Sequence, residues 1–230
     1  MSYPQWGDSV PALKRYNSYM NITNLTRTTF AEAWHTFMKR PWFLAGCTLL
    51  LIIISAMSGS IAQNVSDTAP AWTALVIVLL DFFIVQMLVS MSFITMGLKA
   101  LDQIDTLRFN DLWAPHPFIA YLVAYVIMTI VEVTGFAMYK IPGIIATILL
   151  IFMPFLVMNR MLSPIQALKE SYRMSSKHFL EVTFLLGAVL CVNVLGAVLL
   201  GFGLLVSIPV TVIALARAYH TLSIPDQISV

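Results

Sequence analysis

Long stretches without a charged side chain most constrain how this chain can fold. The stretch 43–62 contains twenty residues, and none of them is Asp, Glu, Lys or Arg. A helix of about twenty apolar residues crosses the roughly 30 Å hydrocarbon core of a bilayer. The whole sequence is 59% hydrophobic and 10% charged, whereas a soluble domain carries about 25% charged residues. The sequence therefore predicts an all-α, polytopic membrane protein.

Six long, mainly apolar stretches follow one another along the chain. The predicted transmembrane helices cover residues 43–62, 71–98, 118–139, 143–158, 179–200 and 203–219. Two of the connections are so short that they allow only tight turns, so we expect six transmembrane helices in three hairpins. The predicted domains are a polar N-terminal tail (1–28), a six-span membrane domain (29–222) and a short C-terminal tail (223–230).

A polar segment before the first span predicts a helix on the membrane surface. Thr29 and Glu32 have the spacing of a capping box, in which each side chain accepts a hydrogen bond from a free backbone donor at a helix start. Trp34 and Phe37 share one face of the helix that would follow. Large aromatic side chains on one face and basic residues at the end are typical of an interfacial helix.

Two later segments continue this pattern. Residues 99–116 are polar with a weaker amphipathic pattern, and residues 163–177 form a stronger one. In the second, Ser163 can cap the helix and Pro164 suits its first turn. The apolar positions on one face of this helix are Ile165, Leu168 and Tyr172. Each third of the chain would then be a surface helix followed by a hairpin. That layout fits either an internal repeat or any six-span protein.

The basic residues predict the orientation in the membrane. Twelve of the thirteen Lys and Arg side chains fall on one side of the predicted spans, and only Lys140 falls on the other. Because loops rich in Lys and Arg stay in the cytoplasm, both termini are expected to be cytoplasmic. No cleavable signal peptide is evident near the start, so the first span is expected to direct insertion itself.

The region around the fourth span resembles a known family. The residues that carry the resemblance are Pro142, Gly143, Pro154, the segment 163–177, Gly201, Gly203, Pro209 and Tyr219. This pattern resembles the YciC-like inner-membrane proteins of bacteria. It is also similar to the membrane domain attached to some bacterial glycerophosphodiester phosphodiesterases. The resemblance implies a six-span inner-membrane fold and no chemistry, since no residue of this chain matches the phosphodiesterase active site.

Asp81 is the most conspicuous polar residue within a predicted span. It lies ten residues into the second span, about 15 Å deep. An ionisable side chain at the centre of a bilayer costs about 2.5–3.5 kcal/mol on insertion scales, so it should face protein or water. Asp81 could be a proton or cation site, or a hydrogen-bonded strut between helices. We favour the strut.

Other polar and helix-breaking residues also lie within the spans. Glu132 and Asn193 each lie fourteen residues from the cytoplasmic end of their span, about 21 Å deep. Side chains at matched depth can bond across helices, which predicts structural support. Pro154 and Pro209 free backbone carbonyls inside their spans, which could build an ion site but more commonly gives a packed kink.

The remaining sequence features limit the classes of function that we expect. No nucleophile elbow, phosphate loop or metal-spaced cluster is present, so we predict no enzyme and no cofactor. Cys47 and Cys191 both lie in apolar stretches and are expected to be free thiols. Our first hypothesis is a non-catalytic inner-membrane protein that organises or binds other membrane components, protein or lipid, and no nucleic acid. The alternative is a transporter or channel for a small solute or ion that uses Asp81 and the proline-broken spans.

The first prediction tests the topology. In a background without Cys47 and Cys191, Asp67→Cys should react with an impermeant thiol reagent added outside the cell. Arg108→Cys and Arg173→Cys should react only after the membrane is permeabilised, because the basic segments stay in the cytoplasm. Labelling of Arg108→Cys from outside would contradict the six-span arrangement.

Overall fold

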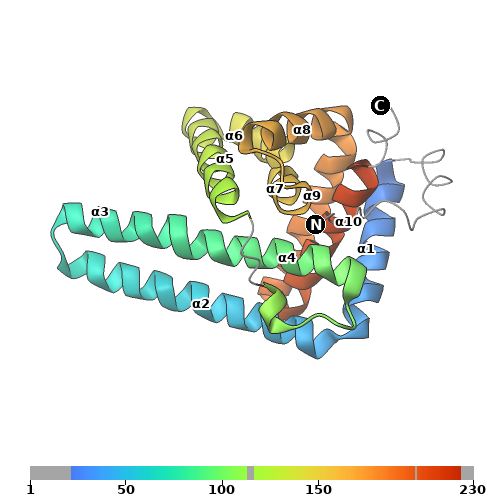
Figure 1. Cartoon of the computed structure of the whole chain (residues 1–230), viewed down its shortest axis with the longest axis horizontal. Helices are drawn as coiled ribbons and strands as arrows, with labels where there is room; N and C mark the ends of the chain where they lie inside the picture. The colour runs from blue at the N-terminus through green and yellow to red at the C-terminus, as the bar shows by residue number, and fades with distance from the viewer. Residues whose placement is uncertain (1–21, 113–116, 200, 224–230) are drawn as a thin grey trace, which may run out of the picture.

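The computed structural model describes residues 22–112, 117–199 and 201–223, and these residues form helices and no strand (Figure 1). The helices are α1 (Ile22–Lys39), α2 (Pro41–Thr68), α3 (Ala71–Leu80), α4 (Met87–Gln103), α5 (Phe118–Met138), α6 (Lys140–Leu150), α7 (Met153–Arg160), α8 (Pro164–Lys177), α9 (Phe179–Val198) and α10 (Leu204–Ser223). A π-helical segment, Asp81–Gln86, joins α3 to α4 without interruption, and a 3₁₀ turn covers Phe109–Leu112.

Within the described residues, six helices are long and apolar enough to cross a membrane. They are α2, the continuous helix 71–103, α5, the α6–α7 pair, α9 and α10. The chain is therefore a multi-pass membrane protein, as the apolar stretches predict. The two longest spans also exceed their predicted ranges: α2 has 28 residues and the helix 71–103 has 33, which correspond to about 42 Å and 50 Å.

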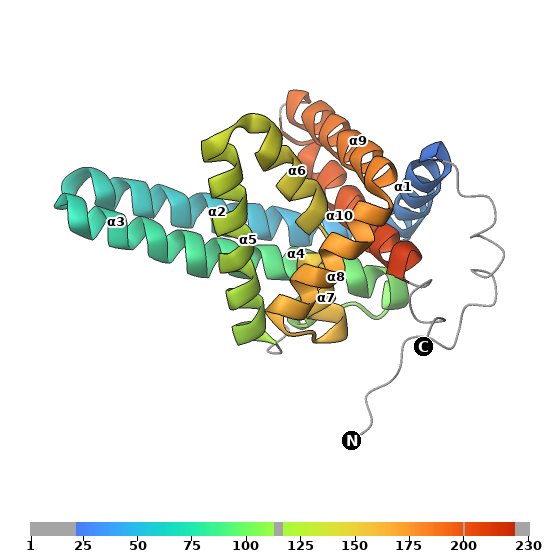
Figure 2. The ribbon, with the colours of Figure 1, turned by 90° about the horizontal axis from the view of Figure 1, so that it is seen from above.

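These two long helices lie side by side and project from the rest of the molecule (Figures 1 and 2). The outer part of the pair consists of α3 and the facing part of α2, and α3 has no buried residue. Its exposed side chains are apolar, including Trp72 at 70% exposure and Leu75 at 60%. In a membrane such side chains meet lipid, so the outer pair is stabilised by the bilayer more than by the protein.

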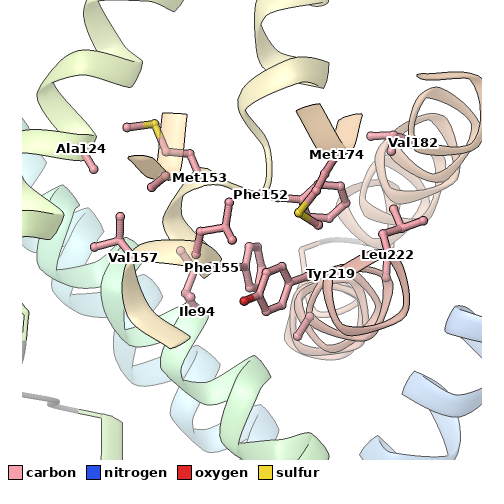
Figure 3. Packing of buried hydrophobic residues seen from close by; sticks show 14 of the residues in the cluster. Ile94, Ala124, Phe152, Met153, Phe155, Val157, Met174, Val182, Tyr219 and Leu222 are labelled. Atoms are coloured by element: carbon pink, nitrogen blue, oxygen red, sulfur yellow. The ribbon is translucent and has the colours of Figure 1, made fainter. Parts of the chain in front are cut away.

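The rest of the molecule is built around two hydrophobic cores. The first contains side chains from α1 and from α4, α5, α6, α7, α8, α9 and α10. The rings of Phe155 and Tyr219 stack within it, 5.8 Å apart (Figure 3). The second joins α1, α2, α4 and α10, with Phe37 and Met96 fully enclosed. Helices α1, α4 and α10 supply side chains to both cores. They are therefore the structural centre of the protein.

Two glycines explain how neighbouring spans pack closely. A Cβ atom on Gly143 would lie 2.5 Å from the Phe136 ring, where α6 packs on α5. A Cβ on Gly203 would lie 2.5 Å from the carbonyl oxygen of Gly196, where the chain turns from α9 into α10. Small residues at such crossings let helix backbones approach, which is the main source of helix association in lipid.

The helix-breaking prolines act in three ways. Pro154 breaks the fourth span, because α6 ends at Leu150 and α7 begins at Met153 with the proline in its first turn. Pro142 lies in the first turn of α6, where its missing N–H costs no helical hydrogen bond. Pro209 lies inside α10, which continues through it.

The predicted capping box at Thr29 and Glu32 is wrong. Helix α1 already begins at Ile22, so Thr29 lies in its interior. Its hydroxyl donates to the carbonyl oxygens of Leu25 (2.8 Å) and Thr26 (3.0 Å) instead of accepting a bond at a helix start. A Thr inside a helix commonly bonds back in this way.

Two further predictions about the surface segments need correction. No helix spans 99–112, since α4 continues to Gln103 and the 3₁₀ turn follows a loop; residues 113–116 lie outside the described part. The apolar residues Ile104 and Leu107 are buried in the second core instead of facing a membrane. In α1, Phe37 is buried there too, whereas the Trp34 ring stacked on it is half exposed.

Arg40 holds this loop in place. Its Nη1 donates to the carbonyl oxygens of Ile104 (3.1 Å), Asp105 (3.1 Å) and Leu107 (3.0 Å). The guanidinium also lies 4.5 Å from the centre of the Phe43 ring, close enough for a cation–π contact. Arg40 therefore ties the loop that follows α4 to the α1–α2 junction.

At the far end of the loop, Asp111 makes a hydrogen bond and an ion pair. It accepts a hydrogen bond from the backbone N–H of Arg108 (2.8 Å) and pairs with Lys99 (3.5 Å). The Arg108 hydrogen bond lowers the pKa of Asp111, and the nearby Lys99 lowers it further. The loop is thus tied at both ends by charged groups.

The Arg40 contacts generate the second prediction. Arg40→Ala should lower the free energy of unfolding by about 1–3 kcal/mol, because hydrogen bonds from a charged donor to the loop carbonyls are lost. Lys39→Ala is the matched control, since it removes a neighbouring positive charge from an exposed position. Thermal unfolding in detergent measures the stability of both variants. Equal destabilisation by the two variants would show that charge, and not the loop contact, matters.

Candidate functional site

Helix α8 has a defined start and a defined buried face. The Ser163 hydroxyl accepts a hydrogen bond from the Gln166 N–H (3.4 Å), and the Gln166 side chain accepts one from the Ser163 N–H (3.3 Å). This capping box, with Pro164 in the first turn, confirms the predicted helix start. The face toward the protein carries small residues: Ala167 is fully buried, and the Ser171 hydroxyl donates to the Leu149 carbonyl (2.9 Å). Small side chains bring α8 close to α6.

A different face of α8 carries the larger apolar side chains. Ile165 is 61% exposed and Tyr172 is 56% exposed, and Leu168 between them is half buried. These are the three positions that the sequence pattern places on one face. A large apolar face that the protein leaves open is what a helix at a membrane surface presents to lipid.

An apolar groove of about 640 Å³ runs between α5, α6 and α8. Its lining residues are Val131, Pro142, Ile145, Ala146, Leu149, Leu150, Leu168, Lys169 and Tyr172. Lys169 and Tyr172 bring the only polar side-chain groups in that lining, and both belong to α8. The groove therefore has long apolar walls with a cation and a phenol along one edge. Pro142, which the sequence marks as a helix breaker, is part of this wall.

Asp81 lies at the start of the π-helical segment. Its Oδ1 is buried and has no hydrogen-bond partner within the described part of the chain. At the other end of the segment, Gln86 accepts a hydrogen bond from the Ser55 hydroxyl of α2 (2.7 Å). Segments of π-helix are rare and occur often at functional sites. Oδ1 of Asp81 therefore makes no hydrogen bond to another helix. The side chain that joins this segment to α2 is Gln86.

Asn193 and Glu132 have separate partners and do not bond to each other. Asn193 accepts a hydrogen bond from the Ser207 hydroxyl (2.9 Å) and donates to the Thr211 hydroxyl (3.2 Å), so it joins α9 to α10. The Glu132 carboxyl faces the Thr147 hydroxyl of α6. Depth along a span sets which residues share a level, but it does not set which helices are neighbours.

Glu132 also lines a second cavity, of about 370 Å³. The wall consists of Phe82 from the π-helical segment and one face of α5. The lining residues are Phe82, Tyr125, Met128, Thr129, Glu132, Val133 and Phe136. Here one carboxyl group lies among aromatic and apolar side chains. The two cavities use different faces of α5.

Polar contacts that the sequence pattern does not reveal join α10 to α1 and to α7. Arg217 of α10 forms an ion pair with Glu32 of α1. Asn159 donates to the Tyr219 hydroxyl (3.2 Å), and Arg160 donates to the Ser223 carbonyl (3.1 Å). An Asn-Arg pair at the end of an apolar stretch signals a polar surface, but its partners lie some sixty residues away and no local pattern reveals them.

Metal binding finds no support in the part of the chain that the structure describes. No group of three or more His, Cys, Asp or Glu side chains converges there. Met87 and Met91 are buried in the first core and act as apolar packing. Cys47 and Cys191 are free thiols, as predicted.

Comparison with protein-family models, with curated proteins and with solved structures finds no match to this chain.

The third prediction separates Asn193 from Asp81. Asn193→Leu should lower the free energy of unfolding by roughly 1–2 kcal/mol, because it removes bonds between α9 and α10 and leaves the Ser207 hydroxyl unpaired. Asp81→Leu should leave thermal stability in detergent unchanged or higher, since Oδ1 loses no partner. A clear loss of stability in Asp81→Leu would show that the carboxyl supports the helix pair after all.

Proposed function

We propose that this chain is a non-catalytic, multi-pass protein of the bacterial inner membrane that binds an anionic phospholipid between α5, α6 and α8. The observation that carries the proposal is the apolar groove with Lys169 and Tyr172 along one edge. A volume of about 640 Å³ lies within the range of small-molecule binding sites, roughly 300–1,000 Å³. The resemblance to YciC-like inner-membrane proteins agrees with this location.

The walls of the groove suit an acyl chain. Val131 of α5 and Ile145 of α6 are both exposed apolar residues of membrane-spanning helices. An acyl chain between them would extend along surfaces that already face hydrocarbon. The groove thus contacts the acyl chain on more than one side, whereas a flat helix surface would contact it on one side only.

The α8 edge suits an anionic headgroup. Lys169 is exposed and its ammonium group can reach a phosphate while its methylene groups stay against the groove. The Tyr172 ring has the apolar body and polar tip that favour the membrane interface. In this arrangement α8 lies on the cytoplasmic surface, both termini are cytoplasmic, and the six spans form three hairpins. The basic cytoplasmic side would also attract anionic lipids of that leaflet.

One observation supports transport of a small solute or ion as a second candidate function. The unpaired Oδ1 of Asp81 at a π-helical segment inside a span is the arrangement expected of a proton or cation site. A liposome flux that is present in the parent chain and lost in a stable Asp81→Asn variant would favour this candidate over the lipid-binding one.

The fourth prediction tests lipid binding. The purified chain should bind phosphatidylglycerol more tightly than phosphatidylcholine in native mass spectrometry. Lys169→Gln should weaken phosphatidylglycerol binding about fivefold, since one basic side chain near the lipid surface contributes about 1 kcal/mol. Ala146→Trp should abolish the bound lipid by filling the groove.

Lys140→Gln is the matched control for the same loss of charge. Lys140 is an exposed residue of α6 outside the groove lining, so this variant should bind as the parent does. Unchanged lipid binding in Ala146→Trp would exclude the groove as the site.

A further inference from the structure

We propose that the second cavity, between the π-helical segment and α5, binds a lipophilic organic cation, with the Glu132 carboxylate as its counter-charge. The cavity measures about 370 Å³, and its wall contains one carboxyl group, three aromatic rings and no Lys or Arg. This site is separate from the groove beside α8 and does not depend on the function proposed there.

The α5 wall of the cavity is one continuous helix face. Its residues recur at helical spacing from Tyr125 through Thr129 and Glu132 to Phe136. The carboxyl therefore lies between the Tyr125 ring two turns before it and the Phe136 ring one turn after it. A bound group between these rings would contact the carboxyl and the aromatic faces together.

Three aromatic rings pack together at the end of the cavity that contains Phe82 and Tyr125. The Phe82 ring lies 5.8 Å from the Tyr125 ring, and the Phe83 ring contacts both at 5.3 Å and 6.4 Å. Ring faces attract cations through their quadrupole, and the attraction grows when the cation is desolvated. Aromatic rings beside a single carboxylate are therefore a site for positive charge.

The chemistry favours an organic cation over a metal ion. Metal ions such as Ca²⁺ and Mg²⁺ need six or more oxygen ligands, from protein or water. The cavity wall offers only the oxygens of Glu132, Thr129 and Tyr125, among apolar side chains. A large organic cation, whose charge is surrounded by apolar groups, needs no such ligands. Contact with the apolar wall strengthens its binding.

The position of the cavity favours a ligand that dissolves in the membrane. Val133 is 62% exposed and Phe136 is 50% exposed, and both belong to a membrane-spanning helix. The cavity therefore opens toward the surface that meets lipid. Glu132 has the Thr147 hydroxyl as its neighbour on α6, so its negative charge would lie in the spans without a basic partner in the cavity wall until a cation enters.

Tetraphenylphosphonium binding to the purified full chain in detergent tests the proposal by isothermal titration calorimetry. The parent should show saturable binding of one cation per chain. Tetraphenylborate, an anion of the same shape, should show no saturable binding. Glu132→Gln should weaken cation binding about tenfold or more, because it removes the counter-charge and keeps the side-chain shape.

Glu181→Gln is the matched control, since it makes the same Glu-to-Gln change in a membrane-spanning helix but outside the cavity wall. Its affinity for the cation should stay within about twofold of the parent. If Glu132→Gln fails to fold, Phe82→Leu replaces it and should weaken binding about fivefold through the lost ring. Equal binding of both tetraphenyl ions, or a parent-like affinity in the variant used, would overturn the proposal.

Discussion

Helix α10 packs against α1, α2, α4 and α9, and this packing holds both hydrophobic cores together (Figure 2). In lipid, apolar surface alone does not drive helices together, so close approach and hydrogen bonds must do so. Two contacts supply them: the backbone of Gly203 meets Gly196, and Asn193 bonds to hydroxyls of α10. The outer part of α2 and α3 has no comparable contact with the body, and its stability depends on the bilayer.

The sequence predicts what depends on local pattern and composition. Long apolar stretches locate six spans, and the Ser163 cap locates the start of α8. Thr29 misleads because any Thr followed three residues later by Glu has the spacing of a capping box, whether or not a helix begins there. The burial of Ile104 and Leu107 depends on Arg40 and on α10, which are distant in the chain. No periodicity within the segment could show that the loop is part of a core.

The polar residues inside the spans fall into two groups, according to the partners that surround them in the fold. Asn193 satisfies its amide with neighbouring helices, which is the structural role expected of a buried polar side chain in lipid. Asp81 and Glu132 differ, because their carboxyl groups lack a basic partner among the contacts described. The sequence identifies all three by depth alone, and depth does not distinguish a strut from a site. The neighbouring helices make that distinction.

Helix α5 explains why the protein has two separate cavities. Val131 lines the groove toward α8 and Glu132 lines the cavity toward the π-helical segment, and consecutive residues of a helix point about 100° apart. The tight contact at Gly143 fixes α6 against α5, so one side of each cavity is held by rigid packing. The other sides come from α8, an amphipathic helix, and from the π-helical segment of the projecting pair. Each cavity therefore joins a fixed wall to an element that presents exposed apolar side chains.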